Sequence, residues 1–89
     1  MSKPTEQERR EECRREVRRY LADRASLAFK TETIRHALER EFVFETGEVR
    51  DALAFLTSAK QAEIAPEGLG ATEYFQITAA GTLAYERGL

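Results

Sequence analysis

The side chains of this chain that could act as nucleophiles, general bases or metal ligands are few and far apart. The sequence has one histidine, His36, and one cysteine, Cys13. A metal site or a catalytic triad needs several such groups at a defined spacing, and neither Ser26 nor Ser58 belongs to a motif that supplies them. The Gly-Leu-Gly run at 68–70 precedes a predicted strand, whereas a phosphate-binding loop precedes a helix. We therefore expect no enzymatic activity, no cofactor and no metal ion.

Arginine is the other chemically informative side chain, and it is concentrated in residues 9–19. Glutamates are interleaved with the arginines there, and pairs such as Glu11 with Arg15 and Glu16 with Arg19 have helix-stabilising spacing. This pattern favours a solvated, self-compensated helix over a basic patch. The arginines that we predict could still contact phosphate or a partner are Arg14, Arg15, Arg18 and Arg19.

Three amphipathic helices are predicted to position these groups. Their apolar residues recur at helical spacing: Cys13, Val17, Tyr20 and Leu21; Ile34, Ala37, Leu38 and Phe42; Val49, Ala52, Leu53 and Leu56. The first helix covers residues 5–23. Thr31 or Thr33 is predicted to cap the second helix and Thr46 the third, with Glu48 in the first turn of the third helix.

A β-hairpin is predicted after the third helix. Two alternating runs, 62–66 and 73–77, are separated by a glycine-containing turn, and alternation places Phe75 and Ile77 on the inner side. Thr78 is predicted to cap a short terminal helix whose Leu83 reaches the core, and residues 25–30 form a short strand or a loop. The fold class is mainly α with a small β-hairpin (α+β). Residues 1–8 are predicted as a tail or fraying first turn and residues 9–89 as a single domain.

This order of elements resembles the winged-helix family, a variant of the helix-turn-helix proteins. The segment FQITAAG at 75–81 is similar to the aromatic-x-Leu-Thr-x-x-Gly signature that closes the wing in many small regulators. The segment VRDALAFL at 49–56 is similar to the family's recognition helix. The resemblance implies a three-helix core, a two-stranded wing and a short C-terminal helix. Small bacterial and phage proteins share this layout, so a phage or mobile-element origin is an expectation.

Two features depart from the family pattern. The residues Lys-Gln-Ala at 60–62 stand where the family usually has glycine before an apolar pair, so Gln61 is predicted to take a left-handed conformation there. DNA-binding members generally carry Lys or Arg on the wing. This wing carries Glu63, Glu67 and Glu73 and no basic residue.

The resemblance implies double-stranded DNA as the partner and a role as a small transcriptional regulator or a phage accessory protein. Arg50 would suit guanine and Gln61 would suit adenine, because their donors and acceptors match those base edges. A homodimer through the N-terminal helix would double a weak half-site. The expected base contacts are Arg50, Thr57, Ser58 and Gln61, and the expected phosphate contacts are Lys60 and Arg35.

The charge distribution favours an alternative function. The net charge is −2 overall, but residues 1–50 carry +1 and residues 51–89, which hold the presumed recognition helix and wing, carry −3. DNA affinity depends largely on neutralised phosphates. The alternative is therefore a protein–protein interaction module of a phage or nucleoprotein assembly, with an acidic wing that does not bind DNA.

Bulk properties set the remaining limits. A chain of 89 residues has room for one hydrophobic core. It has no apolar run of the roughly 18 residues that a membrane span needs and no secretory signal pattern, so a cytoplasmic location is expected. A single cysteine cannot form an internal disulfide.

Overall fold

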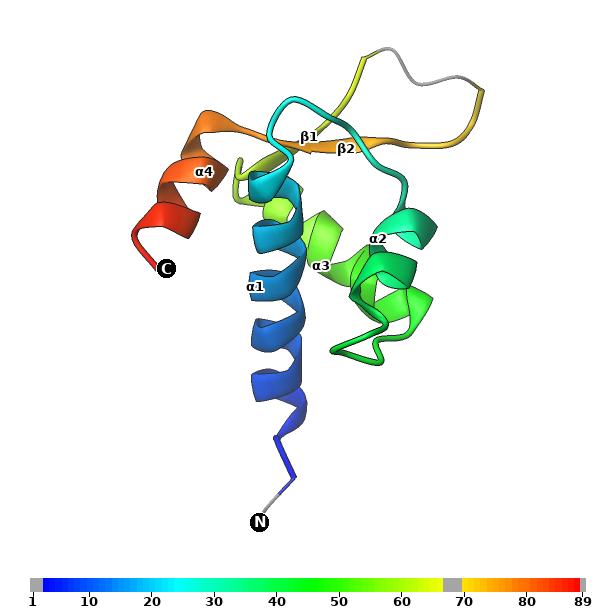
Figure 1. Cartoon of the computed structure of the whole chain (residues 1–89), viewed down its shortest axis with the longest axis vertical. Helices are drawn as coiled ribbons and strands as arrows, with labels where there is room; N and C mark the ends of the chain where they lie inside the picture. The colour runs from blue at the N-terminus through cyan, green and yellow to red at the C-terminus, as the bar shows by residue number, and fades with distance from the viewer. Residues whose placement is uncertain (1–2, 67–69, 89) are drawn as a thin grey trace.

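Four helices and a two-stranded hairpin make up the part of the chain, residues 3–66 and 70–88, that the computed structural model describes. In chain order they are α1 (Glu6–Asp23), α2 (Thr31–Leu38), α3 (Thr46–Ser58), β1 (Ala62–Ile64), β2 (Phe75–Ile77) and α4 (Ala79–Glu86). Figure 1 shows α2 and α4 on opposite sides of α1, with α3 crossing behind α1 and the hairpin lying across its C-terminal end. This is the predicted winged-helix-like α+β fold.

Helix α1 begins at Glu6 with Thr5 as its N-cap, close to the predicted helix of residues 5–23. The Thr5 hydroxyl accepts a hydrogen bond from the Glu8 N–H, and the Glu8 carboxylate accepts one from the Thr5 N–H, each at 3.0 Å. This reciprocal capping box satisfies two donors that a helix start leaves without partners. Residues 6–8 are therefore ordinary helical residues. The predicted stripe of Cys13, Val17, Tyr20 and Leu21 is buried.

The predicted caps of α2 and α3 are wrong. Thr31 is already helical and Thr33 lies inside α2, because the extended backbone ends at Lys30, whose carbonyl accepts from the N–H groups of Thr33 and Ile34. Helix α3 is capped by Glu45, whose N–H donates to the Glu48 carboxylate at 2.9 Å. The Thr46 hydroxyl instead donates to Glu32 of α2.

The hairpin is antiparallel, as predicted, with Ala62 opposite Ile77, Glu63 opposite Gln76 and Ile64 opposite Phe75. The segment 25–30, predicted as a short strand or a loop, contributes a single bridge residue, Phe29, on the other side of β2. Phe29 and Phe75 exchange backbone hydrogen bonds of 2.7 and 2.8 Å. The tip of the predicted turn, with Glu67 and the glycine at 68, lies outside the described residues.

The core lies between α1, α2, α3 and the inner side of the hairpin. All four apolar stripe residues of α3 are buried, as are Phe75 and Ile77. Leu83 was predicted to reach this core but is 44% exposed. Helix α4 packs through its small residues Gly81 and Ala84, which leaves Leu83 on the outer side of a helix that approaches its neighbours closely. No helix among residues 3–66 and 70–88 is long and apolar enough to cross a membrane.

The end of α3 forms a Schellman motif with lysine in the position that usually holds glycine. The Gln61 N–H donates to the Leu56 carbonyl at 2.8 Å, and the Lys60 N–H donates to the Thr57 carbonyl at 3.1 Å. Lys60, with φ of 64°, takes the left-handed conformation, so the assignment to Gln61 was wrong by one residue. The Thr78 hydroxyl donates to the Lys60 carbonyl at 2.6 Å and accepts from the Gly81 N–H, which confirms Thr78 as the cap of α4.

The close approach of α4 to the end of α3 makes Gly81 sensitive to substitution. A Cβ atom at Gly81 would lie 2.0 Å from the Gln61 carbonyl oxygen and 2.7 Å from Cδ1 of Ile77. We expect Gly81→Ala to lower the free energy of unfolding by at least about 2 kcal/mol, because the clash is with backbone. The control is Gly47→Ala in α3, where the Cβ meets nothing within 4 Å and is expected to stabilise by up to about 1 kcal/mol. Equal denaturation midpoints for the two variants would contradict this packing.

Candidate functional site

The outer side of α3 is exposed along the length of the helix. Helices α1 and α2 and strand β1 contact its remaining sides. We call the residues left exposed on the outer side the α3 outer face: Gly47, Arg50, Asp51, Ala54 and Ser58. The face carries one positive and one negative side chain among three small residues. It is therefore neither strongly basic nor strongly acidic.

Arg50 borders a groove between the α3 outer face, the start of α2 and the approach to β2. Its charged lining residues are two cations, Arg50 and Lys30, and two carboxylates, Glu32 and Glu73. Hydrogen bonds from Thr46 and from Arg35 lower the pKa of Glu32, and the Arg50 charge adds to this lowering. Glu32 therefore stays ionised at neutral pH, and the groove is close to charge balance.

On the side of α3 that faces α1, the two helices are joined by a cation–π contact. The Arg14 guanidinium carbon lies 3.7 Å from the centre of the Phe55 ring, which is 45% exposed. One turn further along α1, Arg18 donates from Nη1 to the Gln61 side-chain oxygen at 2.9 Å. These two contacts line the α1 side of α3 with guanidinium groups.

Only two of the four residues predicted to contact bases lie on the α3 outer face. Arg50 and Ser58 both lie on the α3 outer face. Thr57 is half-buried and its hydroxyl donates to the Leu53 carbonyl at 2.7 Å. The Gln61 side-chain oxygen is occupied by Arg18, and its backbone carbonyl accepts from the Thr78 N–H at 3.1 Å. Gln61 thus has a structural role that the sequence did not indicate.

The predicted phosphate contacts also differ in their surroundings. Lys60 is exposed at the start of the wing, where its positive φ fixes the turn out of α3. Arg35 lies on α2 and forms an ion pair with Glu32 at 3.2 Å, so part of its charge is compensated. Of the three predicted contacts Arg50, Lys60 and Arg35, only Arg35 therefore forms an ion pair with a described carboxylate.

The four predicted arginines of α1 divide into two groups. Arg19 forms ion pairs with Glu16 at 2.7 Å and, at longer range, with Asp23 and Glu41. Arg14, Arg15 and Arg18 have no carboxylate within 4 Å among the described residues. The expected Glu16–Arg19 pair is present. Glu11, the expected partner of Arg15, instead accepts from the Gln7 amide, and Arg15 has no such partner.

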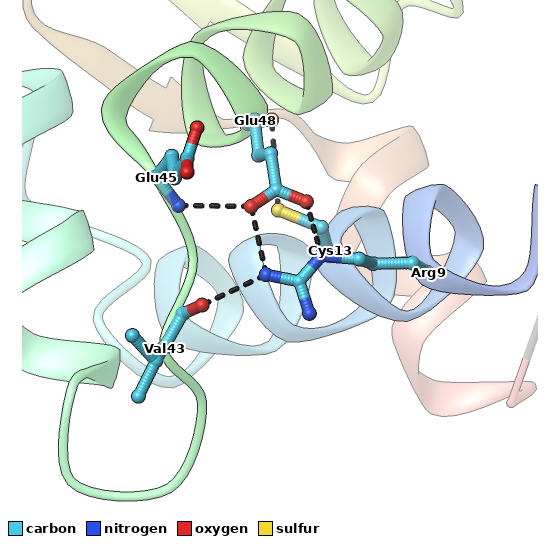
Figure 2. Close-up of polar contacts among 5 residues, drawn as sticks. All are labelled: Arg9, Cys13, Val43, Glu45 and Glu48. Atoms are coloured by element: carbon cyan, nitrogen blue, oxygen red, sulfur yellow. Dashed lines mark hydrogen bonds and ion pairs between the residues drawn. The ribbon is translucent and has the colours of Figure 1, made fainter. Parts of the chain in front are cut away.

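Sequence reasoning missed the ion pair that fixes the start of α3. Arg9 contacts Glu48 through two hydrogen bonds, Nε to Oε2 at 2.5 Å and Nη2 to Oε1 at 2.8 Å, and Nη2 also donates to the Val43 carbonyl (Figure 2). Glu48 accepts as well from the Glu45 N–H. The contact joins α1, the turn before α3 and the first turn of α3. The partners are 39 residues apart in the chain, so no local spacing signals it.

Cys13 lies beside this ion pair, and its thiol has low reactivity. Its thiol donates to the Glu48 carbonyl, with Sγ 3.6 Å from the oxygen, and burial raises its pKa to about 12. The thiol is therefore protonated at neutral pH and is a poor nucleophile. His36 is exposed on α2, and its Nδ1 lies 3.2 Å from Oε2 of Glu39. Nowhere in the described ranges do three His, Cys, Asp or Glu side chains converge on a point that could hold a metal ion.

The Arg9–Glu48 ion pair predicts a pH-dependent contribution to stability. The hydrogen bond from Arg9 is the main cause that lowers the pKa of Glu48 below its ordinary value in the folded state. The stabilisation is therefore complete above the unfolded-state pKa and is lost as the pH falls through the lower folded-state pKa. We expect Glu48→Gln to cost about 1 kcal/mol at pH 7 after allowance for solvent screening, and progressively less toward pH 3.

This prediction is checked by urea denaturation of wild type and variant across that pH range. Glu86→Gln, at the exposed end of α4, is the control and is expected to leave the midpoint at pH 7 unchanged. A Glu48→Gln penalty that stays constant from pH 7 to pH 3 would mean that the stabilisation does not depend on the ionised carboxylate.

Comparison of the chain with protein-family models, with curated proteins and with solved structures finds no match. The likeness to winged-helix proteins thus consists of the element order, the hairpin pairing and the capped α4. At this level the chain is a small α+β domain of three helices, an antiparallel hairpin and a C-terminal helix.

Proposed function

We propose that this chain is a winged-helix DNA-binding domain that contacts double-stranded DNA through the α3 outer face. The observation that carries the proposal is that α3 is packed by α1, α2 and β1 while its outer face stays exposed along the length of the helix. A helix exposed in this way fits the major groove, which is about 12 Å wide. A role as a small transcriptional regulator, or as an accessory protein of a phage or mobile element, would use this contact.

The residue types on the α3 outer face suit close approach to base edges. Arg50 lies one turn into α3, where helix-turn-helix proteins place base-contacting residues, and a guanidinium can donate twice to guanine. Ala54 and Ser58 follow on the same face at four-residue intervals. Their small side chains leave room for the helix to lie deep in the groove. We assign Arg50 the base-reading role and Ser58 a supporting one.

The charges around this face predict weak and salt-sensitive binding. Lys30 and Lys60 are exposed near its two ends and can contact phosphates. The wing contributes Glu63 in β1 and Glu73 just before β2, both exposed, and residues 62–77 contain no Lys or Arg. Each neutralised phosphate contributes a slope of about −0.9 in log K against log salt. A domain with few contacts therefore has a modest affinity, which falls as the salt concentration rises.

Arg50→Ala tests the base-reading role. We expect a loss of about 1–3 kcal/mol in binding to a preferred duplex and relaxed discrimination at one base position, because a bidentate contact is removed. Fluorescence anisotropy on a duplex selected from random sequence measures both effects. The matched control is Arg87→Ala, which removes the same charge from the end of α4. If both variants lose the same affinity, Arg50 acts through net charge and reads no base.

Glu73→Lys tests whether the wing limits affinity. Glu73 lies in the groove beside Arg50, so reversing its charge adds a phosphate contact and removes a repulsion. We expect tighter binding to random duplex DNA and a salt slope steeper by about one unit. The comparison variant is Glu86→Lys, with the same charge change on α4. Unchanged binding by Glu73→Lys would place the wing away from the DNA.

A protein–protein interaction module is the second candidate function. The charge balance of the groove between Arg50, Lys30, Glu32 and Glu73 favours it, because such a groove attracts a polyanion weakly. The two functions are separated by one measurement on the wild-type chain. Absence of duplex binding at about 50 mM salt, where phosphate contacts are strong, would replace the DNA proposal with this one.

A further inference from the structure

Three neighbouring arginines of α1 form no ion pair with a carboxylate of the described part of the chain. Of the six arginines on α1, Arg9 and Arg19 form ion pairs with carboxylates, and Arg10 donates to the Gln7 side-chain oxygen near the start of the helix. Arg14, Arg15 and Arg18, further along α1, form no ion pair with a described residue, and we call these three the α1 arginine patch. Among the neighbouring glutamates, Glu11 accepts from Gln7, Glu16 accepts from Arg19, and Glu12 forms no ion pair with a described residue. The guanidinium groups of the patch are therefore available to a partner.

Arg14 is held in place without using its hydrogen-bond donors. Its guanidinium stacks on Phe55 at 3.7 Å, and none of its N–H groups donates to a described residue. Stacking on an aromatic ring restricts a long side chain and leaves its edges free. The conformational entropy of this side chain is therefore already reduced in the folded protein. A ligand oxygen would meet an oriented guanidinium group.

Arg18 is under-satisfied in the same region. It donates from Nη1 to the neutral Gln61 oxygen, while its Nε is buried and has no partner among the described residues. Burial, with a smaller effect of the Arg15 charge, lowers the pKa of Arg18. A buried donor without a partner and a neighbouring like charge both cost free energy. An anion placed between Arg15 and Arg18 would relieve the repulsion.

We propose that the α1 arginine patch, together with the exposed part of the Phe55 ring, docks an acidic segment of a partner protein. The segment would present at least two carboxylates to the guanidinium groups and an apolar side chain to the ring. Carboxylates match the planar fork of arginine, and arginine with an aromatic residue is the composition of energetically dominant protein interfaces. A DNA backbone would offer phosphates to the arginines but nothing to the ring. This docking site is separate from the α3 outer face and does not depend on the function proposed for it.

The test is an NMR titration of the labelled full chain with a synthetic peptide that has a Glu-Glu-Phe-Glu-Glu core. The control peptide has glutamine in place of every glutamate. We expect saturable shifts at the Nε–H signals of Arg14 and Arg18 and at the Phe55 amide with the acidic peptide only. Arg15→Glu should weaken binding by about tenfold, because attraction becomes repulsion, whereas Arg40→Glu in the turn after α2 should not.

Arg15 is exposed, so its substitution leaves the core intact, and the dispersed amide spectrum of the variant verifies folding. Arg14→Gln is the second variant and should weaken peptide binding while keeping the spectrum dispersed. The proposal is overturned if the acidic peptide causes no saturable shift at the patch at about 50 mM salt, or if the glutamine peptide shifts the same signals equally. Shifts of the patch by a random duplex, without any by the acidic peptide, would assign it to phosphate contact instead.

Discussion

The junction between α3 and the hairpin is the constraint on which the rest of this fold depends. Lys60 takes a left-handed conformation that costs roughly 1–2 kcal/mol in a residue with a Cβ, and four elements meet around it. The carbonyls of residues 60 and 61 accept from Thr78, which in turn caps α4. Arg18 of α1 holds the Gln61 side chain, and Gly81 lets α4 lie against its backbone. The end of α3, the start of the wing and α4 are thereby fixed against α1, and the α3 outer face stays free.

The charged side chains of the fold distinguish two surfaces, one on α1 and one on the outer face of α3. The long-range pair Arg9–Glu48 uses one arginine of α1 to fix the start of α3, and Arg19 is compensated by local acids. Arg14, Arg15 and Arg18 of α1 form no ion pair with a described residue, and Arg14 lies over the Phe55 ring. The α3 outer face is nearly neutral, and the wing beyond it is acidic. A weak DNA contact on α3 and an acidic protein segment on α1 would use these surfaces without competing for the same side chains.

The sequence predicted the parts of the structure that periodicity reports. The buried stripes of α1 and α3 and the pairing of 62–64 with 75–77 were correct, because burial on one side imposes a repeat that a single chain displays. Errors arose where a partner distant in sequence decides the local structure. The bridge to Phe75 keeps Lys30 extended and moves the start of α2, and the close packing of Gly81 turns Leu83 outward. The sequence did not predict the Arg9–Glu48 ion pair or the hydrogen bond from Arg18 to Gln61. In both contacts the partners are far apart in the chain, so no short-range spacing indicates them.

The most direct test of the proposed DNA contact is a chemical-shift footprint of random duplex DNA on the labelled chain at about 50 mM salt. We expect shifts centred on the amides of Arg50, Ala54 and Ser58, with the Arg50 side chain included, and their reversal at about 200 mM salt. Shifts confined to the α1 arginine patch, or none at the lower salt, would contradict the proposed DNA contact.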